Sequence, residues 1–298
     1  MSQNFELAKS RLENISAIEP LLAALRTMSM GTWQMALNKI SQMREFEENY
    51  NHIIAEILPM INQKKIRRIG KKEKTPEIAN TIVLIIGTER GLCGKFNDSL
   101  IENSLKWLDK LDLSSYEIWA MGSRLIQKLI RLDIDIAWRQ SMPTSELVTY
   151  KDAYLTTQKW IDQFESYQFN QFFILINQLA KGSQYQFSAY KLLPFEIQEL
   201  PKRQRDQYQN WPPPIIETGP KGIYQQIIQH NIAASYYEMM LKSSAAEHAA
   251  RFNLMREAKD NAEDIMEELQ RVINTERKRK ITQQMQELAA GAGLLEHT

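Results

Sequence analysis

The chain has 298 residues, of which 43% are hydrophobic and 24% charged, with a formal net charge of +1. This composition is that of a folded protein, and the balanced charge gives no reason to expect nucleic acid as a partner. The single cysteine, Cys93, excludes an internal disulfide and a cysteine-based zinc site. No run of 18 apolar residues could span a membrane, and the start lacks a signal-peptide core. We therefore expect a cytoplasmic or membrane-peripheral location.

The N-terminal segment, residues 2–58, predicts a long helix. A proline inside a helix removes a hydrogen bond and costs about 3 kcal/mol, so we expect a kink or break near Pro20. The basic segment 64–74, KKIRRIGKKEK, predicts a loop that is either a solvated linker or a patch for anionic lipid or an acidic partner. The apolar stripe of the helix consists of Ala8, Leu12, Ile15, Ile18, Leu22, Leu25 and Met28, continued after a small phase shift by Leu37, Ile40, Met43, Phe46, Tyr50, Ile53 and Ile57.

Residues 80–200 have the pattern of an α/β domain. Continuous apolar runs at 81–86, 116–120 and 172–176 predict buried parallel strands, and 185–190 alternates like an edge strand. Helical patterns at 97–111, 124–132 and 154–164 separate them, so we expect a mainly parallel sheet. Prolines and glycines at 201–222 predict a linker.

The last quarter predicts a second long helix, because residues 223–290 contain neither proline nor glycine. Such a helix would be about 100 Å long, too long to be buried in the core of its own chain. An ordinary amphipathic helix packed on a globular core is the alternative. Steps of three and four, typical of a coiled-coil seam, connect Leu241, Ala245, His248, Phe252, Met255, Lys259, Ala262, Met266, Leu269 and Ile273.

The predicted fold is therefore an α/β domain inserted between two long helices. The helices would pair as an antiparallel coiled-coil shaft, and the inserted domain would carry a Rossmann-like, mainly parallel sheet. The predicted boundaries are an N-terminal shaft helix at 1–62, an α/β foot domain at 75–205 and a C-terminal shaft helix at 206–298.

The loop from Gly87 to Asn97 follows a strand and opens a helix, which is where phosphate-binding loops occur. Its sequence nevertheless fails the P-loop pattern, since Glu89 stands where the first glycine belongs and Phe96 where the hydroxyl belongs. The dinucleotide fingerprint is also absent. Cys93 as a nucleophile would need a base from elsewhere, and a small buried thiol in a tight turn is the simpler interpretation. We expect no catalytic site, no cofactor and no metal.

A basic collar lies late in the last helix, made of Arg271, Arg277, Lys278, Arg279 and Lys280. A solvated helix face is one interpretation. A ring of cations that meets acidic loops of a surrounding protein is the other.

Three motifs, in order, resemble the gamma subunit of F-type ATP synthases. The loop T-E-R-G-L-C-G-K-F-N at 88–97 is similar to the family's S-D-R-G-L-C-G-G-x-N. The segments 247–255 and 258–262 resemble E-H-x-A-R-M-x-A-M and A-T-D-N-A, and 281–292 resembles I-T-Q-E-I-x-E-I-V-x-G-A. Leu192-Leu193-Pro194 after the edge strand also matches. The resemblance covers the whole architecture.

The departures from the family pattern indicate a divergent member, as in an alternative or sodium-translocating ATPase. The first helix has Pro20–Ser29 where the family has K-I-T-x-A-M-x-M-V-A-A, and it keeps Ala24 and one cation, Arg26. Gln284 replaces the usual glutamate, Lys278 a glutamine, and Lys95 the second loop glycine. The regulatory cysteine pair of chloroplast members is absent.

The resemblance implies a non-catalytic central rotor stalk that couples rotation of a membrane ring to the catalytic sites. It implies alpha, beta and epsilon subunits and the membrane c-ring as partners, and a peripheral place on the cytoplasmic face of the plasma or thylakoid membrane. It makes Arg277 and Thr282 candidate contacts with the catalytic subunits. Further candidate subunit-interface residues are Arg90, Gly91, Leu92, Cys93, Gly94, Asn97, Arg271, Lys278 and Gln284, with Gly91 and Gly94 in a role that can be wholly structural. The alternatives are a coiled-coil scaffold with an α/β recognition domain and an enzyme working at loop 87–97.

Overall fold

A computed structural model describes residues 2–57, 80–111, 115–143, 147–180, 184–195 and 219–291. The predicted basic loop at 64–74 lies outside the described residues, and so does most of the predicted linker at 201–222. The chain forms two compact units. Unit 1 combines Met1–Ser29 with Phe252–Thr298, and unit 2 is Met30–Arg251. Each of the two long helices contributes to both units.

The long helices are α1, Ser2–Ile57, and α6, Pro220–Gly291. Of the kink or break expected near Pro20, the break is wrong, because helix α1 continues through Pro20. Helix α6 begins at Pro220, inside the expected linker, because proline suits the first turn of a helix, where its missing N–H leaves no bond unmade. The absence of breakers up to Ala290 lets α6 run for 72 residues.

Unit 1 is an antiparallel helix pair. Glu19 on α1 pairs with Lys259 on α6 at 3.5 Å. Ser16, one turn before Glu19, donates to the sulfur of Met266, which lies two turns after Lys259. Ala8, Met255, Ala262 and Ile273 are buried in the seam. The predicted seam residues of α6 within this unit are all buried or half-buried, which confirms the period deduced from the sequence. On α1, by contrast, the stripe residues Ile18 and Met28 are 50% and 61% exposed.

Unit 2 contains the α/β domain. Its strands are β1 (Thr81–Ile86), β2 (Tyr116–Met121), β3 (Trp138–Gln140), β4 (Gln171–Leu179) and β5 (Tyr185–Leu193). Its shorter helices are α2 (Phe96–Lys110), α3 (Ser123–Arg131) and α4 (Tyr150–Glu165). The sheet has the order β3-β2-β1-β4-β5, with β5 antiparallel and the other pairs parallel. The predicted fold class is therefore confirmed. The short β3 was not expected, because three residues carry no periodic signal.

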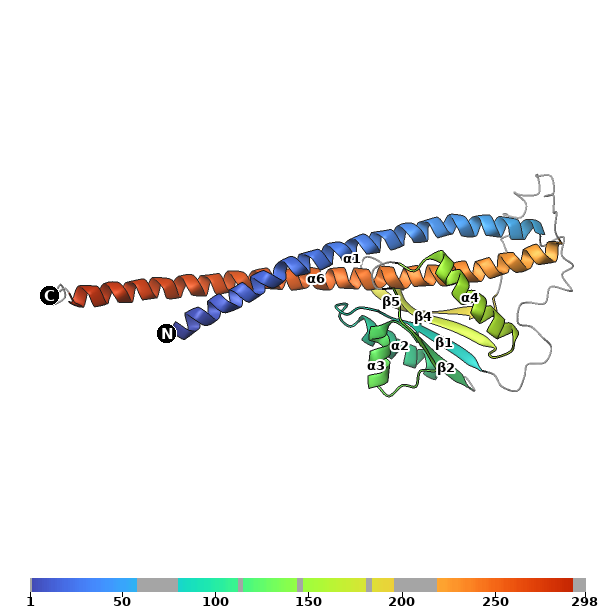
Figure 1. The fold of residues 1–298 in the computed structure, drawn as a ribbon, viewed down its shortest axis with the longest axis horizontal. Coiled ribbons are helices and arrows are strands. Elements are labelled where there is room, and N and C mark those ends of the chain that lie inside the picture. Colours follow the sequence, from blue (N-terminus) through green and yellow to red (C-terminus); the bar gives the residue numbers. More distant parts are fainter. Residues whose placement is uncertain are drawn as a thin grey trace. The chain divides into compact units, whose positions relative to one another are not determined.

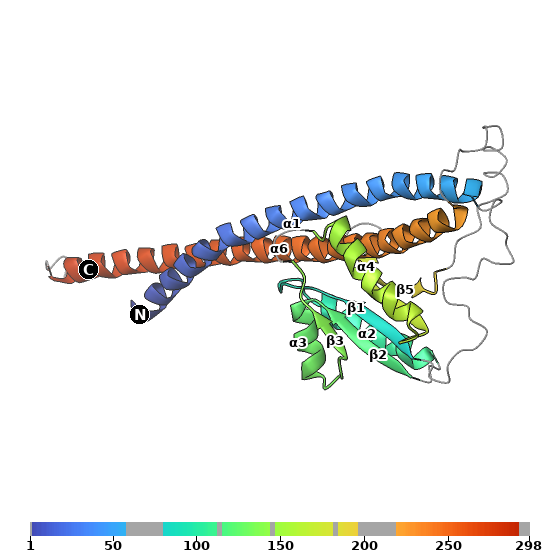
Figure 2. The same ribbon diagram turned by 45° about the vertical axis from the view of Figure 1, so that its right-hand side comes forward.

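The sheet is covered on both faces. Ile82, Leu84 and Ile86 point toward α4 and the Ile228–Leu241 part of α6, while Val83 and Ile85 point toward α2 and α3. Figures 1 and 2 show α4 beside α6 on one face. A strand buried on both faces must be apolar at every position, which is why β1 is a continuous run. The Met43 side chain of α1 also joins the first cluster.

Candidate functional site

Loop 87–97 leaves β1 where the strand order reverses. The chain passes from β1 to β2 and β3 on one side of the sheet and returns to β4 on the other side of β1. In open α/β sheets the crevice at the carboxyl ends of such strands is the usual ligand site. Here protein fills it, since the Asn177 amide from β4 donates to the Phe96 carbonyl at 3.0 Å, and both side chains are fully buried.

Two glycines allow the loop to pass this close to the sheet. A Cβ at Gly87 would lie 2.6 Å from the Leu125 Cβ and 2.8 Å from the Asn97 Oδ1. Gly122 has φ +102°, and a Cβ there would lie 2.8 Å from the Thr88 carbonyl oxygen. A side chain is therefore excluded at Gly87 by the side chains of Leu125 and Asn97, and at Gly122 by the backbone of Gly87 and Thr88.

Reciprocal hydrogen bonds fix the ends of the loop. The Thr88 backbone N–H donates to the Asn97 Oδ1 at 3.1 Å, and the Asn97 amide donates to the Thr88 hydroxyl at 2.8 Å. The Glu89 carboxylate accepts from the Ser123 N–H and hydroxyl and from the Met142 N–H. Burial would raise the pKa of Glu89, but these hydrogen bonds from Met142 and Ser123 outweigh it and leave the pKa below its usual value.

The middle of the loop packs on α6. Cys93 and Phe96 form a buried cluster with Ala246 on that helix, and the half-buried Ala250 packs against it. Burial raises the pKa of the Cys93 thiol, whose sulfur lies 3.7 Å from the Thr88 hydroxyl. A buried protonated thiol is a weak nucleophile. This placement supports the packing interpretation of Cys93 rather than the catalytic one.

An ion pair on α6 reaches the same loop. Arg251 donates to the Gly91 carbonyl at 3.2 Å and pairs with Glu247 at 2.5 Å, and both side chains are buried. Neither residue was among the predicted site residues, although both lie within the matched motif. The available signal was an i, i+4 acid–base pair inside a row of alanines, where small side chains allow another backbone to approach.

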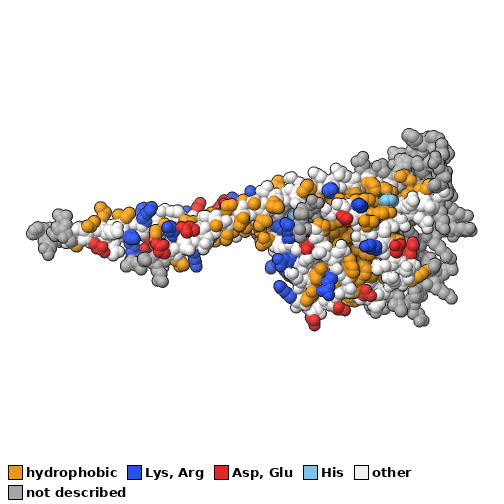
Figure 3. All heavy atoms as spheres, viewed as in Figure 1, with side chains coloured by type: hydrophobic (Ala, Val, Ile, Leu, Met, Phe, Trp, Pro, Cys, Tyr) orange, Lys and Arg blue, Asp and Glu red, His pale blue; other side chains and the backbone are white. Residues whose placement is uncertain are grey.

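The exposed face of the loop is cationic. Arg90 and Lys95 are exposed, as is Arg124 at the start of α3. Figure 3 shows Lys and Arg side chains gathered at the end of the α/β domain where α3 lies. Leu92 adds an apolar side chain that is 57% exposed, on a backbone with φ 63°. Cys93 and Asn97, also predicted to serve a subunit interface, are buried within unit 2.

The second group of predicted site residues lies on α6 in unit 1. Arg277, Lys278, Thr282 and Gln284 are all exposed. The Thr282 hydroxyl donates to the Lys278 carbonyl one turn earlier, at 3.0 Å. Arg271, also exposed, pairs with Glu267 on the same helix at 3.5 Å.

Apolar side chains accompany these cations. Ile281, Met285 and Leu288 follow each other at steps of four and three, so they share a helix face. They are 50%, 66% and 73% exposed. Unit 1 therefore presents a terminal surface that is both basic and apolar, and we call Arg277, Ile281, Met285 and Leu288 the terminal face.

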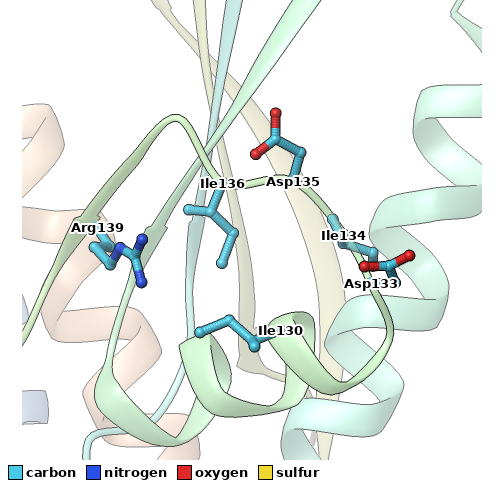
Figure 4. A pocket seen from close by; sticks show the side chains of 6 residues that line it. All are labelled: Ile130, Asp133, Ile134, Asp135, Ile136 and Arg139. Atoms are coloured by element: carbon cyan, nitrogen blue, oxygen red, sulfur yellow. The ribbon is translucent and has the colours of Figure 1, made fainter.

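A surface pocket of about 250 Å³ lies between the end of α3 and the edge strand β3. Figure 4 shows Ile130 and Ile136 pointing toward one another across it, while the carboxylates of Asp133 and Asp135 point away. The arrangement does not converge polar groups on one point, and such convergence is what ligand binding requires.

Comparison with known proteins identifies the family. The family model described as ATP synthase matches residues 4–295, so the chain belongs to the ATP synthase family. It is 21% identical over 287 residues to the "ATP synthase gamma chain" of Fusobacterium nucleatum, covering 96% of this chain and 98% of that one. It is 24% identical over 302 residues to the gamma chain of Bdellovibrio bacteriovorus, covering 96% and 97%. The resemblance deduced from the three motifs is thus confirmed.

Solved structures share the fold. A chain of the central stalk and c-ring of the Tetrahymena thermophila mitochondrial ATP synthase superposes with a TM-score of 0.54 at 19% identity, covering 80% of this chain and 99% of that chain. A chain from the Euglena gracilis mitochondrial ATP synthase gives 0.61 at 12% identity, covering 100% and 99%. None of the described helices is both long and apolar enough to cross a membrane.

Proposed function

We propose that this chain is the central rotor stalk, or gamma subunit, of a membrane ion-translocating ATP synthase. The observation that carries the proposal is the terminal face of α6, on a chain whose relatives are gamma chains. An isolated helix pair that exposes Met285 and Leu288 beside Arg277 leaves apolar area in water. Such area is stabilised when it is buried by a partner, at about 25 cal/mol per Å².

The proposed partners are the alpha and beta subunits around the helix pair, and the epsilon subunit and c-ring at the α/β domain. We propose that the chain supplies no catalytic group and lies peripherally, on the cytoplasmic face of the membrane. The solved Euglena gracilis chain comes from an assembly described as containing F1 and the c-ring, which supports these partners in general terms.

The physical mechanism would be differential binding. An asymmetric helix pair cannot contact three identical catalytic subunits in the same way, so each orientation would favour a different conformation at each site. Inverting a two-state site from 1:99 to 99:1 requires about 5.5 kcal/mol of differential interaction. Under this proposal that energy comes from contacts of the helix pair.

The structure sharpens which residues we propose as contacts. On unit 1, the exposed guanidinium of Arg277 is the strongest candidate for an acidic loop of a catalytic subunit. The Thr282 hydroxyl donates its hydrogen bond to the Lys278 carbonyl, so its oxygen can still accept a hydrogen bond from a partner. Arg271, Lys278 and Gln284 remain candidates by exposure and position.

On unit 2, the exposed residues Arg90, Leu92 and Lys95 would contact the neighbouring subunits directly. The buried Cys93 and Asn97 would act through the shape of the loop, together with Gly91 and Gly94. Gly94 has φ +59°, in the region that favours glycine.

Co-purification with the alpha and beta subunits of the same organism tests the proposal. We expect the full chain to form a complex that hydrolyses ATP, and the Met285→Asp/Leu288→Asp variant to assemble several-fold less well because the carboxylates resist burial. Leu155→Asp is the control, since Leu155 on α4 is 52% exposed and lies outside the terminal face. Assembly of the double variant at the unaltered level would contradict the proposal.

The scaffold alternative predicts a different result, namely stable binding of other proteins with no ATP-hydrolysing complex. The enzyme alternative predicts that the isolated chain binds nucleotide at loop 87–97. Titration of the chain with ATP checks this, and tight binding that is lost on substitution of Lys95 would revive it.

A further inference from the structure

Arg251 lies on α6 where loop 87–97 packs against that helix, and its side chain is only 6% exposed. Its guanidinium makes three contacts. Nη2 donates to Glu247, Nη1 lies 3.2 Å from the His248 Nδ1, and Nε donates to the Gly91 carbonyl at 3.2 Å. Two of these partners belong to α6 and the third belongs to the loop. The guanidinium is therefore oriented by its own helix and directed at the loop backbone.

The protonation of the neighbours suits this arrangement. Burial lowers the pKa of His248 to about 4, and Arg251 and Arg90 lower it in the same direction. His248 is thus neutral at pH 7, and its Nδ1 can accept a hydrogen bond from the Arg251 guanidinium. Burial raises the pKa of Glu247, and the neighbouring Arg251 guanidinium opposes part of that rise.

Stability does not explain why a charged pair stands here. Burying two charges costs several kcal/mol per ion, and well-packed neutral residues often serve equally well in their place. Cys93 and Phe96 of the loop also pack on alanines of the helix. Such contacts are not directional, so they would tolerate sliding along the helix. The planar guanidinium of Arg251, in contrast, has donors in a fixed geometry, so its hydrogen bonds define one position of the loop.

We propose that Arg251 is a positioning residue that latches loop 87–97 to α6, with Glu247 and His248 holding its guanidinium. The exposed Arg90 and Lys95 would then move with α6 as one body. This inference rests on the proposed function, because a rotor needs its partner-facing loop to follow its shaft. The geometry of the latch can be tested without that function.

The variant of choice is Glu247→Gln/Arg251→Met, which removes both charges and leaves no buried ion unpaired. Its control is Glu102→Gln/Lys106→Met, an i, i+4 pair in the same unit whose side chains are 66% and 60% exposed. Cys93 is the chain's single cysteine and is 7% exposed. The rate at which N-ethylmaleimide alkylates Cys93 in the full chain therefore reports release of the loop.

We expect the latch variant to react about tenfold faster or more, because a local opening that was rare becomes frequent. Amide hydrogen exchange should accelerate in the loop and stay unchanged in β1, β2 and β4, which separates loop release from general unfolding. The control should react within about twofold of the parent chain. Unchanged alkylation and exchange in the folded latch variant would overturn the proposal.

If the double variant does not fold, Arg251→Lys provides a second test of the same contact. Lysine retains the charge that Glu247 needs, but its ammonium lacks the planar fork. We expect partial release of the loop, and behaviour identical to the parent chain would contradict the latch.

A second measurement uses the assembled complex. Ion translocation per ATP hydrolysed should fall several-fold with the latch variant and stay at the parent level with the control. If the rotor function is wrong, the chain does not assemble although the loop is still released. If the latch is wrong, the complex assembles and couples while alkylation of Cys93 stays slow.

Discussion

The two parts of α6 differ in what their apolar residues meet. In unit 2, every residue from Ile227 to Arg251 is buried or half-buried. In unit 1, from Asn274 to Ala290, all residues except Glu276 and Ala289 are exposed. The first part is rich in apolar residues and completes a core, whereas the second is rich in charged and amide side chains and exposes most of the few apolar residues that it carries. One continuous helix can therefore be part of a core at one end and exposed at the other.

The ion pairs of the two parts of α6 also differ in their exposure to water. In unit 2 the Glu247–Arg251 pair is buried, and its geometry is fixed by the helix and the loop. In unit 1 the Glu267–Arg271 pair has the same spacing, but its side chains are 74% and 82% exposed. Water screens the second pair and leaves Arg271 able to exchange partners.

The largest expected effect on stability comes from shortening a buried leucine of α6, and the same change at an exposed leucine of that helix is its control. Leu241→Ala should lower the free energy of unfolding by about 2–5 kcal/mol, because it opens a cavity in a packed core. Leu241 is 1% exposed, and the matched Leu288→Ala change affects a side chain that is 73% exposed. Leu288→Ala should stay within about 0.5 kcal/mol in the isolated chain. Urea unfolding followed by circular dichroism measures both, and equal losses would abolish the contrast.

A smaller effect concerns the acid stability of unit 2. The pKa of His248 is about 4 when folded, below its ordinary 6.5, so the unfolded chain binds more protons between these values. The stability that His248 contributes is full above pH 6.5 and falls as the pH drops toward 4, by about 2 kcal/mol between pH 7 and pH 5.

His248→Asn isolates this effect, because asparagine retains an acceptor for Arg251 but does not titrate. Glu247, with a raised pKa, acts in the opposite sense, and its contribution is common to both proteins. Urea unfolding at pH 7 and pH 5 should show a smaller loss for the variant than for the parent chain. Equal losses would mean that His248 is not held neutral in the fold.

The smallest effect is expected at the exposed pair of unit 1. Arg271→Gln should change the free energy of unfolding by less than about 0.5 kcal/mol, since exposed i, i+4 pairs contribute little. In an assembled complex the same change would weaken binding if Arg271 meets an acidic partner. Titration of the complex with salt checks this, because a screened interfacial contact loses affinity as ionic strength rises.

Much of the fold could be predicted because its signals are local. The apolar run at 81–86 matches β1, and the seam from Leu241 to Ile273 matches the buried side of α6. A run that is apolar at every position can be satisfied only between two covered faces, and a 3.5-residue repeat only by a helix with a partner. The absence of helix breakers after Ile223 likewise required no tertiary information.

Other features depended on neighbours distant in the sequence. The cost of an interior proline favoured a break of α1 at Pro20, but the helix continues through it. Ile18 and Leu241 both belong to predicted apolar stripes, but Ile18 is exposed, whereas Leu241 is buried in the core cluster of unit 2.

The amino-acid sequence by itself determined the element types, the inserted α/β domain and the three motifs of the family, since these follow from periodicity, breakers and residue identity over short spans. Only the tertiary structure decided that Cys93 and Asn97 face inward, and that Arg251 reaches a carbonyl 160 positions away in the chain. Burial and hydrogen-bond partners arise when distant segments meet, and a pattern within one segment does not encode which segment it will meet.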